Sequence, residues 1–79
     1  MKLRRDMDAA ELIKALSRLG YQVVRQTGSH MRLQCSDPMH SLTIPNHRPL
    51  RIGTLAAIIA DVAARRRVDK DTLVRQLWP

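Results

Sequence analysis

The fold is indicated by one short stretch, Arg25-Gln26-Thr27-Gly28-Ser29-His30-Met31, which has the composition of a β-hairpin tip. Residues that favour strands precede it at 21–24, and apolar and polar residues alternate after it. This period of two puts alternate side chains on opposite faces of a strand: Met31, Leu33 and Cys35 on one, and His30, Arg32 and Gln34 on the other. We expect the apolar set to face a core. His30 would then stand on the outer face, as a candidate acid or base beside a bound phosphate.

The charge balance favours an anionic partner. The chain carries 14 Lys and Arg against 7 Asp and Glu, a formal net charge of +7, and eleven of the cations are arginine. The planar guanidinium group can meet phosphate oxygens two at a time. A basic excess of this size in a small chain is typical of nucleic-acid binders. A solvated surface, or a patch that meets an acidic protein, is the alternative.

Length and cysteine content limit the class of protein. With 79 residues the chain is expected to form one domain, 1–79, whose thin core leaves little room for a large cofactor, and we expect none. The lone Cys35 excludes an internal disulfide and fits a reducing cytoplasm. The first residues lack the apolar stretch of a signal peptide, and the apolar run at 55–60 is too short to cross a bilayer. A cytoplasmic protein with no membrane partner is predicted.

Three helices and three strands are predicted around the hairpin tip. A first helix should begin at Asp8, with Glu11 three residues on as in a capping box, and should end near Gly20. Strands are expected at about 21–26, 30–35 and 41–44, with a turn at 36–38. A second helix over 52–64 carries an amphipathic stripe of Leu55, Ile58, Ile59 and Val62. A short third helix should follow its cap, Asp69.

This order of elements predicts an α+β fold. A three-stranded antiparallel sheet with helices packed on one face has the α-β-β-β-α order of the double-stranded-RNA-binding fold. Here an extra short C-terminal helix is added. The other face of the sheet would stay open to solvent and would carry His30.

Several short motifs carry a resemblance to a known family. They are, in order, Leu12-Ile13-Lys14, Gly20-Tyr21, Val24-Arg25-Gln26, Gly28-Ser29-His30, Leu42-Thr43-Ile44-Pro45 and Gly53-Thr54-Leu55. Their order and spacing resemble the HicA (YcfA-like) mRNA interferases, the toxins of HicAB toxin–antitoxin pairs. The resemblance covers about residues 8–64. The extension at 65–79 would either cap the core or form part of a partner surface.

The resemblance implies more than a fold. It implies cleavage of mRNA that depends on the histidine of the motif, and neutralisation by a HicB-like antitoxin. Carried over to this chain, that histidine is His30, and Gly28 and Ser29 shape its turn. We expect the antitoxin to bind across the hairpin, shielding His30 and competing with RNA for the arginines, in a complex that could include an antitoxin oligomer.

The chemistry of RNA cleavage without a metal also favours these residues. It requires a base for the 2′-hydroxyl proton, an acid for the departing 5′-oxygen, and cations for the charge that builds up at phosphorus. Histidine can take either proton role near neutral pH. Arg25 and Arg32, one on each hairpin strand, are expected to hold the phosphate. The predicted RNA-binding set is completed by Lys14, Arg48 and His47, the last also a candidate for the second proton-transfer group. No His, Asp or Glu spacing suggests a metal site.

Other residues have simpler interpretations. His40 is expected in a solvent-exposed hairpin loop. Cys35 is expected to be a small core residue rather than a nucleophile. Ser29 is expected to be a turn residue, because no base stands at a recognisable spacing from it, and Gly28 to supply a positive φ. The three arginines at 65–67 are most simply a solvated helix end, although they could meet RNA or an acidic antitoxin.

Two alternatives to the toxin remain open. The first is a non-catalytic RNA-binding module of the same fold, and the second is a basic adaptor for an acidic protein. Only Tyr21 and Trp78 are aromatic, which argues against recognition of single-stranded bases by stacking. Salt-sensitive RNA binding would separate the module from the adaptor.

Overall fold

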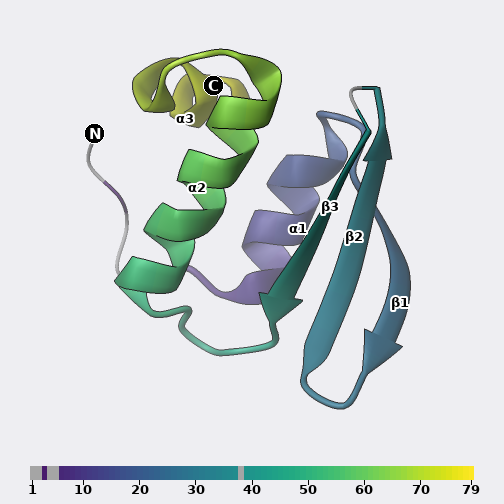
Figure 1. Cartoon of the computed structure of the whole chain (residues 1–79). Helices are drawn as coiled ribbons and strands as arrows, with labels where there is room; N and C mark the ends of the chain where they lie inside the picture. The colour runs from purple at the N-terminus through teal and green to yellow at the C-terminus, as the bar shows by residue number, and fades with distance from the viewer. Residues whose placement is uncertain (1–2, 4–5, 38) are drawn as a thin grey trace.

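The molecule is a three-stranded sheet with helices on one face, as predicted. The computed structural model describes residues 3, 6–37 and 39–79. The elements follow in the order α1 (Ala9–Ser17), β1 (Gln22–Thr27), β2 (His30–Ser36), β3 (Met39–Pro45), α2 (Ile52–Arg66) and α3 (Lys70–Leu77). Figure 1 shows α1 and α2 on the same side of the sheet, with α3 beside the C-terminal end of α2. Pro38 of the predicted turn, and positions 1, 2, 4 and 5 of the predicted domain, lie outside the described residues.

Helix α1 begins after its predicted cap, Asp8, and ends at Ser17, slightly before the predicted end near Gly20. The Asp8 side chain accepts a hydrogen bond from the Glu11 backbone N–H at 2.9 Å, which satisfies one of the open donors of the first turn. Gly20 has a φ of +97°, a conformation that most other residues avoid, and it leads the chain into the sheet. Leu12 and Leu16 are buried against the sheet side of the core, while Ile13 is partly buried.

The sheet is an antiparallel meander in the order β1-β2-β3. On β2 the predicted alternation is confirmed: Met31, Leu33 and Cys35 are buried, and the residues between them are exposed. The register of β1 against β2 shifts between Val23 and Arg25, so that Val24 is an extra residue in a β-bulge. The bulge matters because it places Arg25 opposite Arg32 while Val23 still lies opposite Leu33.

The prediction that His40 lies in an exposed loop is wrong. Strand β3 begins at Met39, two residues earlier than predicted, because Ser36 pairs with Met39 and Cys35 with His40 across a tight connection. Since Cys35 faces the core, its partner His40 faces the core too, and only 6% of that residue is exposed. Composition alone favoured a loop, whereas strand pairing decided the burial.

The C-terminal segment completes the hydrophobic core. Helix α2 buries its predicted stripe, Leu55, Ile58, Ile59 and Val62. Arg67 then caps α2 in the left-handed conformation, at a φ of 59°, and turns the chain into α3. Asp69 caps α3, as predicted, and Leu73 and Leu77 are fully buried in the core. Each such leucine stabilises the fold by about 1.5–3 kcal/mol, so residues 65–79 contribute to the folded core.

Candidate functional site

His30 is the first residue of β2, at the tip of the β1–β2 hairpin. Its backbone lies opposite Thr27 on β1 and opposite Pro45 on β3, and its side chain is exposed. Gly28 has a φ of +55°, which confirms the positive φ expected at this turn. The neighbouring strands on both sides therefore hold the backbone of His30 in place while its imidazole meets solvent.

Two arginines are paired two positions along the ladder from His30. Arg25 of β1 and Arg32 of β2 are directly paired in register, and both are exposed. Paired residues in adjacent strands have Cβ atoms about 4.5–5.5 Å apart, and like charges in such a pair repel each other. Because Arg32 is two residues after His30, it shares the face of the sheet that carries His30. An anion bound at this Arg25–Arg32 rung would offset the repulsion between the two positive charges.

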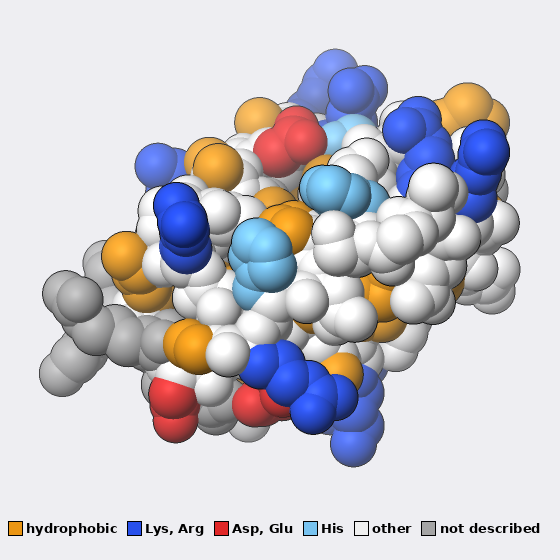
Figure 2. Space-filling view, turned by 90° about the horizontal axis from the view of Figure 1, so that it is seen from below, with side chains coloured by type: hydrophobic (Ala, Val, Ile, Leu, Met, Phe, Trp, Pro, Cys, Tyr) orange, Lys and Arg blue, Asp and Glu red, His pale blue; other side chains and the backbone are white. Residues whose placement is uncertain are grey.

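The loop after β3 brings a second histidine to the same end of the molecule. The Asn46 backbone N–H donates to the Ser29 carbonyl at 2.6 Å, which ties the loop to the hairpin tip. His47 follows, anchored by its N–H to the Pro45 carbonyl at 2.9 Å and by its carbonyl to the Ala9 N–H at 3.3 Å. Figure 2 views this end from below and shows histidine side chains near its centre, with lysine and arginine side chains around them.

Among the predicted RNA-binding residues, one stands apart from the others. His47 and Arg48 are exposed in the loop that is bonded to the hairpin tip. Lys14, by contrast, lies on α1 in a groove that is also lined by Glu11, Arg18 and Trp78, within the helical layer. Arg51, which was not singled out in the sequence, is exposed as the N-cap of α2 at the end of the same loop as Arg48. Its position immediately before the predicted second helix is the signal in the sequence that could have identified Arg51.

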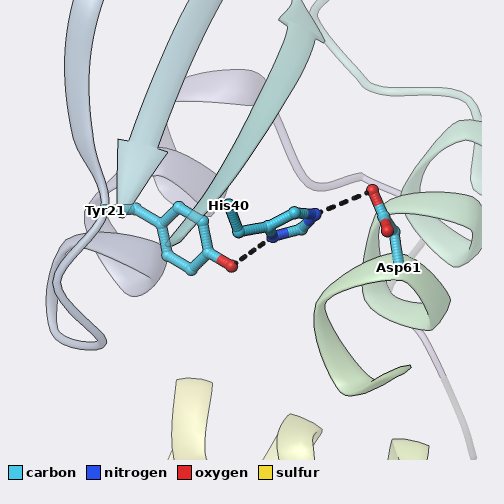
Figure 3. Close-up of polar contacts among 3 residues, drawn as sticks. All are labelled: Tyr21, His40 and Asp61. Carbon is cyan, nitrogen blue, oxygen red and sulfur yellow. Dashed lines mark hydrogen bonds and ion pairs between the residues drawn. The ribbon is translucent and has the colours of Figure 1, made fainter. Parts of the chain in front are cut away.

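A polar cluster of two buried residues, Tyr21 and His40, and the partly exposed Asp61 lies away from His30 and was missed in the sequence. The Tyr21 hydroxyl and the His40 Nδ1 are 2.6 Å apart, and His40 Nε2 is 3.2 Å from Asp61 Oδ2 on α2 (Figure 3). Because a carboxylate only accepts, Nε2 carries a hydrogen, and in the neutral imidazole Nδ1 then accepts from the Tyr21 hydroxyl. Burial raises the pKa of Tyr21 above its ordinary 10.0, which keeps the hydroxyl protonated. The cluster links the sheet to α2.

Two further observations concern ligands and membranes. Within residues 3, 6–37 and 39–79, no three His, Cys, Asp or Glu side chains gather in a way that could hold a metal ion. In that same part of the chain, no helix has the length and apolar character needed to cross a membrane.

Comparison with known proteins identifies the family. The profile described as HicA toxin of bacterial toxin–antitoxin matches residues 9–63, which is more than half of the chain. This chain belongs to the HicA toxin family. The match runs from the start of α1 almost to the end of α2, so it includes the hairpin with His30 and leaves α3 outside. Membership of this family implies that the toxin has an antitoxin partner. Searches of curated proteins and of solved structures gave no match to the chain.

Proposed function

We propose that this HicA toxin is a metal-independent endoribonuclease that cleaves mRNA, with His30 as a proton-transfer group. One observation carries the proposal: His30 is exposed at the start of a strand, two ladder positions from the paired Arg25 and Arg32 on the same open face. An acid–base side chain beside a fixed cationic pair is the arrangement that phosphodiester cleavage needs.

In the proposed reaction, the 2′-oxygen of a ribose attacks the adjacent phosphorus and the 5′-oxygen of the next nucleotide leaves. A base removes the 2′-hydroxyl proton, and an acid delivers a proton to the departing 5′-oxygen. His30 takes one of these roles, and His47, in the loop bonded to the hairpin tip, is the candidate for the other. Arg25 and Arg32 offset the negative charge that builds up on the phosphate oxygens. Gly28 and Ser29 shape the turn that presents His30.

The antitoxin is proposed to be HicB-like and to cover this same face. The hairpin exposes His30 and two cations together, so a partner that buries it would both occlude the reactive imidazole and compete with RNA phosphates. Acidic side chains on the partner would complement the arginines, and their charge would speed association at low salt.

The test compares purified wild-type toxin with His30→Ala on a synthetic RNA in the presence of a metal chelator. Wild type should cleave, and His30→Ala should bind the RNA with unchanged affinity but cleave about 10²–10⁴-fold more slowly. His47→Ala is the matched variant, expected to shift the pH–rate profile if it supplies the second proton. An RNA with 2′-deoxyribose at the cleaved position should be cleaved by neither the wild type nor His47→Ala.

Two results would contradict the proposal. Cleavage at the wild-type rate by a folded His30→Ala protein would remove His30 from the chemistry. RNA binding without cleavage by the wild type, with or without added divalent metal, would favour a non-catalytic RNA-binding module instead.

A further inference from the structure

A second cationic site lies at the other end of the molecule from His30. Three arginines, together with Asp37, Asp61 and Ala64, line an open pocket of about 730 Å³ where α2 ends, and the arginines are Arg65, Arg66 and Arg67. Asp37 directly follows β2, whereas His30 begins that strand. At about 3.3 Å per residue, the length of β2 separates the two sites by roughly 20 Å.

The arginines are not needed to complete the helix end. The Ala63 and Ala64 carbonyls, which lack partners farther along α2, already accept from the Arg67 backbone N–H, and Ala63 also accepts from the Val68 N–H at 3.1 Å. Arg65 and Arg67 are exposed and Arg66 is half-buried. Their guanidinium groups are therefore available to a ligand in the pocket.

The two carboxylates of the pocket decide which ligand fits. Asp61 is oriented by His40 Nε2, 3.2 Å from its Oδ2, and its side chain is nevertheless 56% exposed (Figure 3). Asp37, an exposed residue that directly follows β2, lines the same pocket. Any anionic ligand would be attracted by the arginines and repelled by both carboxylates, so the ligand that fits should also bring hydrogen-bond donors for the carboxylates. A ribose-phosphate backbone offers anionic phosphates to the arginines and 2′-hydroxyl donors to the carboxylates.

We propose that this pocket binds the ribose-phosphate backbone of the RNA at a point several nucleotides away from the cleaved bond. This proposal rests on the proposed function, because it assigns the RNA a second contact beyond His30. Arg65 and Arg66 hold phosphate oxygens, and Asp37 accepts from a ribose hydroxyl. None of the described residues that line the pocket is aromatic, so recognition is of the backbone and does not depend on base stacking. RNA that spans both sites binds more tightly than RNA that fills only one.

The test measures RNA binding on the His30→Ala background, so that cleavage does not interfere. Arg65→Gln/Arg66→Gln should weaken binding of a long single-stranded RNA by about tenfold or more and should lower the slope of log affinity against log salt by about 1.4. Lys70→Gln/Arg75→Gln on α3 removes the same charge and is the matched control, expected to change both quantities little. Arg67 is kept because its left-handed backbone caps α2.

A second variant tests the ribose contact separately. Asp37→Ala should reduce the preference for RNA over DNA of the same sequence, while leaving DNA affinity unchanged or raised. Asp61 is kept because it contacts His40. Circular dichroism of each variant should match that of the parent protein.

The outcomes distinguish this proposal from the proposed function. Unchanged affinity and salt slope in Arg65→Gln/Arg66→Gln, or an equal loss in the α3 control, would overturn the second site even if wild-type cleavage is intact. Loss of binding to the antitoxin or to polyglutamate, with RNA binding unchanged, would assign the pocket to an acidic protein and also overturn it. Failure of the wild type to cleave RNA would refute the proposed nuclease activity. The differences in RNA affinity between these variants could still be measured.

Discussion

Arg25 lies directly opposite Arg32 across the β1–β2 pair, and the β-bulge at Val24 is what brings them into register. Like charges in paired positions cost up to about 1 kcal/mol each relative to neutral pairs. Both side chains are exposed, so solvent screens part of this repulsion. A phosphate between the two guanidinium groups would turn that repulsion into two charge-assisted contacts, two ladder positions from His30.

Substitution of Arg25 or Arg32 should lower the affinity for RNA without lowering the stability of the fold. In Arg25→Gln and in Arg32→Gln, we expect RNA affinity to fall and the salt slope to decrease by about 0.7–1 for each lost phosphate contact. Because the repulsion is also removed, the thermal midpoint should stay equal or rise slightly. Fluorescence anisotropy at several salt concentrations and thermal melting measure the two effects, with Arg75→Gln as the control. The same affinity and slope in both variants and wild type would place the RNA elsewhere.

The proposed antitoxin contact predicts a defined pattern of hydrogen exchange. Binding of a HicB-like antitoxin should protect the backbone amides of the 25–34 hairpin, and the complex should form more slowly as salt is raised. Arg25→Gln/Arg32→Gln should associate more slowly than wild type at low salt. Protection restricted to α1 and α2, with the hairpin unchanged, would show that the antitoxin inhibits by another route.

The Tyr21–His40 contact should contribute strongly to stability. His40→Ala removes buried volume and leaves the Tyr21 hydroxyl without its partner, and we expect a loss of about 2–4 kcal/mol in the free energy of unfolding. Tyr21→Phe should cost about 1 kcal/mol, and the double variant should cost less than the sum, because the two groups contact each other. Urea unfolding of the four proteins measures the coupling. Strict additivity would argue against the contact.

Asp61→Asn tests the contact between His40 and Asp61, at the exposed end of the cluster that Tyr21 begins. Its side chain is 56% exposed, so the pairing with His40 is screened by solvent, and we expect a change below about 1 kcal/mol.

The cap of α3 should make stability depend on pH in the acid range. The Thr72 backbone N–H donates to Asp69 Oδ1 at 2.6 Å, and this bond, followed by the Thr72 hydroxyl, lowers the pKa of Asp69 below its ordinary 3.8. A lowered folded-state pKa means that the carboxylate stabilises the fold above 3.8, and that this contribution is lost as the pH falls through the lower value.

Asp69→Asn isolates that contribution, because asparagine also caps helices but does not titrate. The wild type should melt at a higher temperature than Asp69→Asn at neutral pH, and the difference should shrink as the pH falls below 3.8. Since the other carboxylates are the same in both proteins, their titration cancels in the difference. A difference that stays constant from neutral to acid pH would contradict the assigned role of Asp69.

Local signals in the sequence were sufficient for most of the elements. The caps Asp8 and Asp69, the positive-φ residues Gly20 and Gly28, and the alternation along β2 all depend on residues only a few positions apart. The order of those elements predicted the fold, and the hairpin motif predicted where His30 would stand. These features follow from short-range sterics, hydrogen bonding and hydrophobic period, which a sequence displays directly.

Pairing between distant segments decided the remaining features. The register of β1 and β2, with its bulge, set Arg25 against Arg32, and the register of β2 and β3 turned His40 inward toward Tyr21 and Asp61. Packing of α3 buried Leu73 and Leu77, and the bond from Asn46 to Ser29 brought the His47 loop to the hairpin. A shift of one residue in strand register reverses the face of every side chain. Such choices depend on contacts made only after the chain has folded, so the tertiary structure alone determined them.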